Sequence, residues 1–288
     1  MSSTYIIAEI GINHNGSLDT ALKLIDAAKE AGCDAVKFQA RTIELVYTPE
    51  ELAKPRESVF GATNGDLKRG LEFSVDQFRH IDHYCHDAGI DWSASCWDVQ
   101  SVDRIAAFNP PFLKIPSALI TNKDLLEAYR QTGIPMVMST GMSTWEEIDA
   151  AVNLLADQDY SYRQKNAIGY RFPILTLTHC HSSYPSPLEE INLACIRSFQ
   201  DRYGLPVGYS SHTVSPWPCL MAAVYGAEVI EAHLTLDRTM WGTDQAASLE
   251  PVAFQKLVQE IRTWELCKGD GVKRVYPSEE PVKAKLRR

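Results

Sequence analysis

The sequence predicts an α/β protein whose eight parallel strands and eight helices form one (β/α)8, or TIM, barrel. Short apolar runs of strand length alternate with amphipathic stretches of helix length along the whole chain. Strands separated by helices favour parallel pairing, because a parallel connection needs a dozen residues or more. Dividing 288 residues among eight units gives about 36 residues each, which suits a closed barrel of this class.

The expected elements alternate in order. The strands are expected at 5–11, 35–39, 92–96, 112–117, 135–140, 174–180, 207–211 and 229–235. The helices are expected at 17–31, 74–88, 98–108, 122–131, 144–156, 188–202, 216–225 and 251–266. The first helix illustrates the reasoning, since Ser17 is a good N-cap, apolar residues recur at helical spacing from Leu18, and Gly32 ends the pattern.

Three segments fall outside this alternation. Residues 41–72 form a long polar stretch with Pro and Gly, and residues 157–171 form a second polar and aromatic insertion. The charged tail 270–288 leaves no room for a second domain, so residues 1–288 are expected to form a single barrel domain. The alternative architecture, a doubly wound open sheet, usually carries GxGxxG or a P-loop after a strand, and the sequence has neither.

Composition limits the partners. A net charge of −9 disfavours broad electrostatic binding to nucleic acid or to an anionic membrane, so the positive charges for an anionic substrate must be local. Seven scattered cysteines without a CxxC pair indicate a reducing compartment. The N-terminus lacks a basic region like that of a signal peptide, and no apolar run is long enough to span a bilayer. We therefore expect a cytoplasmic protein.

Polar residues gather where the expected strands end, which is where the active sites of such barrels lie. Lys37 and Gln39 share one face of their strand, because side chains alternate with a period of two. The other candidates at this rim are Glu9, Lys114, Ser117, Ser139, Tyr184, Ser210, His212, Glu231 and His233.

This composition suits an anion beside a metal ion. A lysine or glutamate inside a barrel is costly unless it is paired or binds a ligand. Two lysines and several hydroxyls suit a phosphate or a carboxylate. His212 and His233 end adjacent strands and can share a metal ion, with Glu231 as a further ligand, an orienting group or a substrate contact.

Each candidate has a structural alternative. A single histidine at a strand end is more often structural than a ligand, and Lys37 can form a core ion pair with Glu9. Trp241 is equally compatible with a lid, a substrate contact or ordinary partial burial. Among the remaining residues we expect a solvated helix face for His80, His83 and His86, packing for Cys33, Cys85 and Cys195, and a place beside the site for Cys96 or Cys180.

Several segments resemble one known family. They are AEIGINHNG…VKFQ (8–39), STGM (139–142), HC…YPSP (179–187), GYSSHT (208–213) and EAHLTLDR…GTDQAASLEP (231–251). In this order they resemble the N-acetylneuraminate (sialic acid) synthase family over nearly the whole chain. The resemblance implies a (β/α)8 barrel that condenses phosphoenolpyruvate with an aldose-type acceptor, using a divalent metal, typically Mn2+ or Mg2+. Phosphate and a 2-keto-3-deoxy sugar acid are the implied products.

The resemblance also implies roles for particular residues. It implies metal ligands at His212 and His233. It implies phosphoenolpyruvate contacts at Lys37, Lys114, Ser117, Ser139 and Ser210, and acceptor contacts at Gln39, Tyr184, Glu231 and Asp244. Catalytic roles are implied for Glu9, Lys37, Lys114 and Glu231.

The chain departs from the family pattern mainly on the acceptor side. Relatives usually continue into a small antifreeze-like C-terminal domain, which we expect to be missing here because the chain ends at Arg288. The common GSGE is Pro116-Ser117-Ala118-Leu119, which lacks a carboxylate, and PGPD is Trp241-Gly242-Thr243-Asp244. An acceptor other than N-acetylmannosamine is therefore a serious hypothesis.

Two other functions remain open at this stage. Lys37 or Lys114 could form a Schiff base in a class I aldolase, because desolvated lysines on barrel strands support that chemistry. The chain could also be a degenerate barrel without activity. The expected partners are small-molecule substrates, with a homodimer or a higher homo-oligomer as the assembly.

Overall fold

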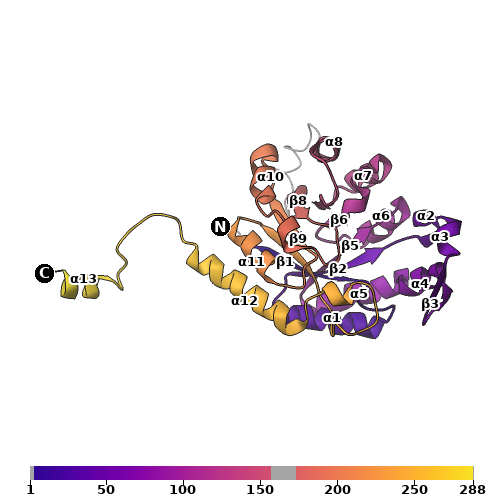
Figure 1. Ribbon diagram of the computed structural model, residues 1–288, viewed down its shortest axis with the longest axis horizontal. Helices are drawn as coiled ribbons and strands as arrows, with labels where there is room; N and C mark the ends of the chain where they lie inside the picture. The colour runs from indigo at the N-terminus through magenta and orange to yellow at the C-terminus, as the bar shows by residue number, and fades with distance from the viewer. Residues whose placement is uncertain (1–2, 157–172, 288) are drawn as a thin grey trace.

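The computed structural model describes residues 3–156 and 173–287. Within them, eight parallel strands close into a barrel in the order β1-β10-β9-β8-β7-β6-β5-β2, which confirms the expected fold class (Figure 1). The strands are β1 (Tyr5–Gly11), β2 (Ala35–Ala40), β5 (Asp91–Cys96), β6 (Leu113–Ile115), β7 (Met136–Ser139), β8 (Leu175–Cys180), β9 (Val207–Ser211) and β10 (Val229–His233).

Helices follow the strands around the outside of the barrel. They are α1 (Leu18–Ala31), α5 (Val75–Ala88), α6 (Val99–Ala106), α7 (Lys123–Gln131), α8 (Trp145–Leu155), α10 (Cys195–Tyr203), α11 (Trp217–Val224) and α12 (Pro251–Cys267). The predicted caps of α1 are confirmed: the Ser17 hydroxyl accepts from the Thr20 N–H, and Gly32 takes a left-handed φ of 85°.

The helix expected at 188–202 begins later than predicted. Leu188–Glu190 forms a single 3-10 turn, and α10 begins only at Cys195. Asn192 lies between them with a φ of +48°, which an α-helix cannot contain. The prediction was wrong here because Asn adopts this conformation at little cost and leaves no strong sequence signal.

The polar stretch 41–72 is more ordered than a loop. It contains α2 (Ile43–Val46), α3 (Pro49–Leu52), a hairpin of β3 (Pro55–Ser58) and β4 (Gly61–Thr63), and α4 (Asn64–Leu71). Phe60, at the hairpin tip, lies so close to the backbone that a methyl group at Gly70 would be 2.2 Å from its ring and one at Gly16 would be 2.9 Å from it. Glycine at both positions therefore lets the hairpin lie against the barrel rim.

The alternation of side chains along the strands divides the barrel interior into two halves. Residues 5 and 7 of β1 point inward with four others to form an apolar cluster of Tyr5, Ile7, Ala35, Phe112, Val137 and Val229. The intervening residues of the strands pack outward against the helices in the main hydrophobic core. Above the inner cluster, the inward positions become polar, beginning with Glu9 and Lys37. One end of the barrel is therefore filled, and chemistry is confined to the other.

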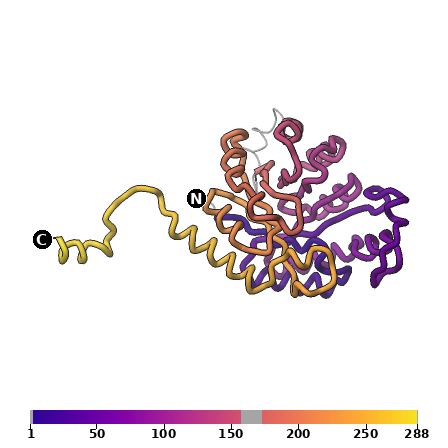
Figure 2. Tube along the Cα trace, viewed as in Figure 1, coloured from indigo at the N-terminus to yellow at the C-terminus, as the bar shows by residue number. Residues whose placement is uncertain are grey.

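After α12 the chain leaves the barrel. Figure 2 shows this segment standing away from the remaining structure, with α13 (Glu280–Leu286) near its end. Among the described residues, no helix combines the length and apolar character needed to cross a bilayer. The predicted insertion at 157–171 lies outside the described residues, and the single-domain assignment of the whole chain stays a prediction.

Candidate active site

A pocket of about 200 Å³ opens at the carboxyl ends of the strands. Of the residues predicted from the sequence, ten line it: Glu9, Lys37, Gln39, Lys114, Ser117, Ser139, Tyr184, Ser210, His212 and Glu231. His233 is buried beside His212, with the two ring centres 5.5 Å apart. Asp244 lies next to His233, with a carboxylate oxygen 4.0 Å from His233 Nδ1.

Lys37 forms the core ion pair that the sequence suggested. Glu9 and Lys37 are register partners on β1 and β2, and Lys37 Nζ lies 2.5 Å from Glu9 Oε2. The ammonium group also donates to Ser95 Oγ at 2.7 Å. Burial favours the neutral lysine, but the carboxylates of Glu231 and Glu9 outweigh it and raise the pKa of Lys37 above its ordinary value. Lys37 is therefore a cation in the folded protein.

A second ion pair spans the barrel. Lys114 on β6 donates to Ser139 Oγ at 2.5 Å and lies 3.3 Å from Glu231 Oε1 on β10. Ser210 donates to the same carboxylate oxygen at 2.9 Å. Burial alone would raise the pKa of Glu231, but Lys114 and Lys37 lower it below its ordinary value, so Glu231 stays ionised.

The pocket holds polar atoms that lack partners. Two lysines face two glutamates, so the ionised pocket has no net charge from these four residues. Gln39 Oε1, Glu231 Oε2 and His233 Nδ1 are buried and accept no hydrogen bond from any described residue. Buried polar atoms are normally satisfied, so these three indicate a place where a ligand binds.

The two histidines are prepared to bind a cation. His212 Nδ1 lies 2.5 Å from the carbonyl oxygen of His181, so it carries the proton and Nε2 keeps its lone pair, which accepts from the Tyr184 hydroxyl at 2.8 Å. Burial, together with His233, lowers the pKa of His212 to about 3, so the ring is neutral. A neutral imidazole with a free lone pair is a suitable metal ligand, and the ring of His233 lies beside it.

Carboxylates do not complete a metal site in this arrangement. Within residues 3–156 and 173–287, no cluster of three His, Cys, Asp or Glu side chains is placed to hold an ion. The donor set therefore amounts to the two imidazoles of His212 and His233, with the remaining positions left to water or substrate. This set fits a divalent ion that keeps open coordination positions.

The structural alternatives have mixed outcomes. Cys180 lines the pocket with its sulfur 3.1 Å from Ser117 Oγ, whereas Cys96 is buried away from it. Trp241 is 46% exposed and does not line this pocket. As expected, the exposed face of α5 carries His80, His83 and His86, while Cys33 and Cys85 are packed and Cys195 is half-buried.

Among the pocket residues to which sequence reasoning gave no role are Ser95, Trp97, Met142 and Ser182. Ser95 lies near the end of β5, so the same strand-end argument would have found it. The position of Trp97 depends on Arg41, whose guanidinium lies 5.1 Å from the centre of its ring, and sequence spacing alone gives no sign of this contact.

The fold and the pocket together define a (β/α)8-barrel enzyme whose site, at the carboxyl ends of the strands, combines paired lysines, hydroxyls and imidazoles. Comparison with known proteins identifies the family. The chain belongs to the NeuB family, whose model matches residues 24–273. The sialic acid synthase-like enzyme expected from the sequence motifs is thereby confirmed.

Individual relatives agree with this assignment. The human N-acetylneuraminate-9-phosphate synthase is 35% identical over 285 residues, which cover 98% of this chain and 76% of that protein. The N,N'-diacetyllegionaminic acid synthase of Legionella pneumophila is 35% identical over 287 residues, which cover 99% of this chain and 78% of that protein. A crystal structure of N-acetylneuraminic acid synthetase from Leptospira borgpetersenii, in complex with citrate, superposes with a TM-score of 0.82 at 30% identity. The superposition covers 100% of this chain and 93% of that one.

Proposed function

We propose that this enzyme condenses phosphoenolpyruvate with an aldose-type acceptor to give a 2-keto-3-deoxy sugar acid and phosphate. Relatives named as sialic acid and legionaminic acid synthases support this reaction class. One of these relatives is named for a phosphorylated product and the other is not, so their names leave the phosphorylation of the acceptor open.

The observation that carries the proposal is the pair of lysines. Lys37 and Lys114 are buried cations whose N–H groups now point to Ser95, Ser139 and two carboxylates. A phosphate or carboxylate entering the pocket takes over some of these donors and makes charge-assisted hydrogen bonds. Hydroxyls of Ser117, Ser139 and Ser210 lie around the same space and supply further donors.

Positioning is the main catalytic contribution of this clamp. Holding phosphoenolpyruvate by both ends fixes its methylene carbon toward the histidine side of the pocket, where the acceptor's aldehyde carbon is bound. A new carbon–carbon bond leaves positive character at C2 of phosphoenolpyruvate, and water adds there before phosphate departs. Glu9 and Glu231 lie beside this position, one to stabilise the charge and one to accept the proton from water.

The acceptor side is formed by Gln39, Tyr184 and Asp244. Gln39 Oε1 has no described partner and can accept from an acceptor hydroxyl. The Tyr184 ring lies 4.0 Å from that of His212 and is half exposed at the mouth of the pocket. These groups can orient a polyol chain without fixing its length.

His212 and His233 are the residues that would hold a divalent metal ion. Bound there, Mn2+ or Mg2+ supplies a Lewis acid that polarises the acceptor's carbonyl group. Tyr184 now occupies the lone pair of His212 Nε2, so its hydroxyl must turn away when a ligand binds, which couples the acceptor contact to the histidine pair.

The Schiff-base alternative is less well supported. A lysine nucleophile must lose its proton, and neighbouring carboxylates raise the pKa of Lys37. Lys114 is also held by a carboxylate, Glu231, at 3.3 Å. Borohydride reduction in the presence of pyruvate should therefore give no covalent adduct on either lysine.

The direct test is phosphate release from phosphoenolpyruvate with Mn2+ and a panel of aldoses, amino sugars and their phosphates. We expect phosphate release that depends on the acceptor, and a product mass equal to the acceptor plus the three-carbon unit. An absence of phosphate release across the panel would overturn the proposal and favour the degenerate barrel. Cytoplasmic location and assembly into a homodimer or higher homo-oligomer stay predictions.

A further inference from the structure

Trp97 lines the pocket with a side chain to which the proposed reaction gives no role. It follows β5 directly, and its backbone N–H donates to the Ala40 carbonyl oxygen at 3.1 Å, which ties it to the end of β2. The indole Nε1 is buried and donates to no acceptor among the described residues. The pocket wall therefore contains a hydrogen-bond donor that the protein itself does not use.

A buried indole N–H normally has an acceptor. Trp92, also on β5, donates from Nε1 to Asp82 Oδ1 at 2.8 Å. A buried donor without an acceptor is costly, so the Trp97 N–H needs an oxygen atom from outside the chain. Because the ring lines a pocket, this oxygen belongs to a ligand or to a water molecule that the ligand displaces.

Arg41 lies against the Trp97 ring. Its guanidinium carbon is 5.1 Å from the ring centre, within the range of a cation–π interaction. A guanidinium group has donors only, so it can orient the ring but cannot accept from the indole N–H. The contact with Arg41 therefore fixes the donor without satisfying it.

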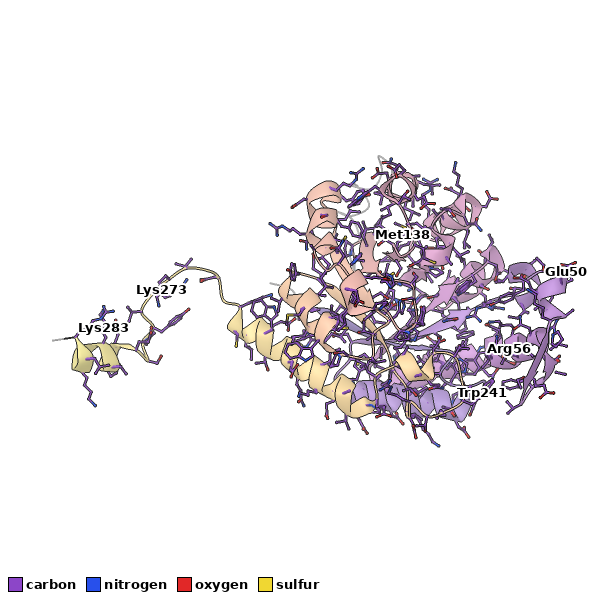
Figure 3. All side chains as sticks on the ribbon, viewed as in Figure 1. Glu50, Arg56, Met138, Trp241, Lys273 and Lys283 are labelled. Carbon is purple, nitrogen blue, oxygen red and sulfur yellow. The ribbon has the colours of Figure 1, made fainter. Side chains whose placement is uncertain are left out.

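Arg41 is buried and is itself anchored by Glu72. Its backbone N–H donates to Glu72 Oε2 at 3.0 Å, and its Nη1 lies 3.3 Å from Glu72 Oε1. These two residues are the first and the last of the insertion, residues 41–72, and Figure 3 labels Glu50 and Arg56 in its outer part, at the edge of the barrel. The ion pair thus closes the base of the insertion against the ring that Arg41 holds.

The depth of Trp97 in the pocket indicates which substrate it meets. Ser95 lies two residues earlier and accepts from Lys37 Nζ at 2.7 Å, at the level of the lysines proposed to hold phosphoenolpyruvate. A strand rises about 3.3 Å per residue, so Trp97 lies roughly 6–7 Å nearer the mouth. The acceptor, which covers phosphoenolpyruvate, is the substrate at this level.

We propose that Trp97 binds the acceptor by donating its indole N–H to an acceptor oxygen, and that Arg41 is the positioning residue that holds the indole for this contact. On the adjacent strand, Gln39 Oε1 is also buried without a described partner. Acceptor hydroxyls match both groups, because a hydroxyl both accepts and donates. This inference rests on the proposed condensation, and it adds a specificity determinant on the wall formed by β2 and β5.

The test measures condensation of phosphoenolpyruvate with mannose, N-acetylmannosamine and N-acetylmannosamine 6-phosphate in the presence of Mn2+, with the product quantified by mass. Trp97→Phe keeps an aromatic ring and removes the N–H, whereas Arg41→Gln removes the cation beside the ring. Trp145→Phe and Arg202→Gln are the matched controls, since the Arg202 guanidinium lies 4.9 Å from the Trp145 ring centre and neither residue lines the pocket. Circular dichroism establishes that each variant is folded.

We expect Trp97→Phe to raise the KM for the acceptor by roughly tenfold, with little change in kcat or in the KM for phosphoenolpyruvate. Arg41→Gln should raise the same KM by roughly three- to tenfold, and Arg41→Lys should restore most of the loss because it keeps a cation beside the ring. In the Trp97→Phe background, Arg41→Gln should have little further effect, because Arg41 acts through the indole N–H. Both controls should match wild type.

The outcomes separate this inference from the proposed function. A wild-type KM for the acceptor in Trp97→Phe would overturn the inference and leave the condensation intact. Equal rises in the KM for the acceptor and for phosphoenolpyruvate would also overturn it, and additive losses in the double variant would overturn the positioning role of Arg41. If Arg41→Gln does not fold, Trp97→Phe and Arg41→Lys decide the question. If no acceptor gives product with wild-type enzyme, the proposed condensation fails and this inference fails with it.

Discussion

Replacing Tyr129 with phenylalanine tests how α7 holds the strands beneath the pocket. Tyr129 is fully buried, and its hydroxyl lies 2.6 Å from the Lys114 carbonyl oxygen and 2.8 Å from that of Cys96. The same hydroxyl accepts from the Cys96 N–H at 2.9 Å. Strands β5 and β6 are joined at the register pair Ser95–Lys114. The Tyr129 hydroxyl therefore supports the two strands where the hydrogen-bonded ladder between them is short.

The size of the effect follows from these contacts. The phenyl ring still fills the space, but one N–H and one carbonyl group lose their partner in the interior. Each buried unsatisfied group costs about 1–3 kcal/mol, so we expect Tyr129→Phe to lower the free energy of unfolding by about 2–4 kcal/mol, allowing for partial relaxation. Tyr84→Phe makes the same chemical change at an exposed hydrogen bond to Asp26, and should cost at most about 0.5 kcal/mol.

Equilibrium unfolding in urea, followed by circular dichroism and by tryptophan fluorescence, measures both variants. Coincident transitions are required before the two free energies are compared. A difference between Tyr129→Phe and Tyr84→Phe of less than about 1 kcal/mol would refute the reasoning, because it would mean that the freed backbone groups find other partners at little cost.

Three further predictions concern the pocket and its surroundings. Lys114→Met removes the cation that pairs with buried Glu231 and should lower kcat/KM for phosphoenolpyruvate by roughly a hundredfold or more. Lys273→Met, in the exposed tail, is the control and should leave kcat/KM unchanged. A loss below about tenfold in Lys114→Met would contradict the proposal that Lys114 holds phosphoenolpyruvate. Chelation with EDTA should abolish phosphate release, added Mn2+ should restore it in wild type but not in His212→Ala, and full activity without metal would sink the metal proposal. Burial raises the pKa of Glu72 from its ordinary 4.5 to about 7 despite its ion pair, so the folded state binds the extra proton in that window, and the contribution of Glu72 to stability should fall by about 3 kcal/mol as pH rises from 4.5 to 7. Neutral buried histidines such as His212 change stability in the opposite direction over this range, so urea unfolding at pH 5 and pH 8 is compared between wild type and Glu72→Gln. Wild type should lose about 3 kcal/mol relative to the variant, and equal slopes for the two proteins would contradict it.

Much of the rim could be predicted because parallel strands end at a common edge. The placement of His212 beside His233 needed only the knowledge that consecutive strands are neighbours, and the shared face of Lys37 and Gln39 needed only the two-residue period. The Glu9–Lys37 pair followed in the same way, since the two strands are adjacent.

Contacts across the barrel could not be predicted in this way. Glu231 meets Lys114 only because the sheet closes with a particular stagger, which local sequence does not encode. A second cavity, lined by Arg56, Lys68 and Trp241, depends on how the insertion folds back onto a loop nearly two hundred residues away. Two signals within the insertion were available, because Thr48 with Glu51 and Thr63 with Asp66 form capping boxes that mark the starts of α3 and α4.

The apolar cluster fills the end of the barrel opposite the pocket, so the pocket is open at one end only. Molecules that reach Lys37 and Lys114 must pass the mouth formed by Tyr184 and its neighbours, and they must leave by the same way. A ligand held against the lysines therefore enters before the ligand that covers it, and the deeper product waits for the outer one. The six side chains that close the other end of the barrel therefore set the order in which ligands bind and leave, although none of them lines the pocket.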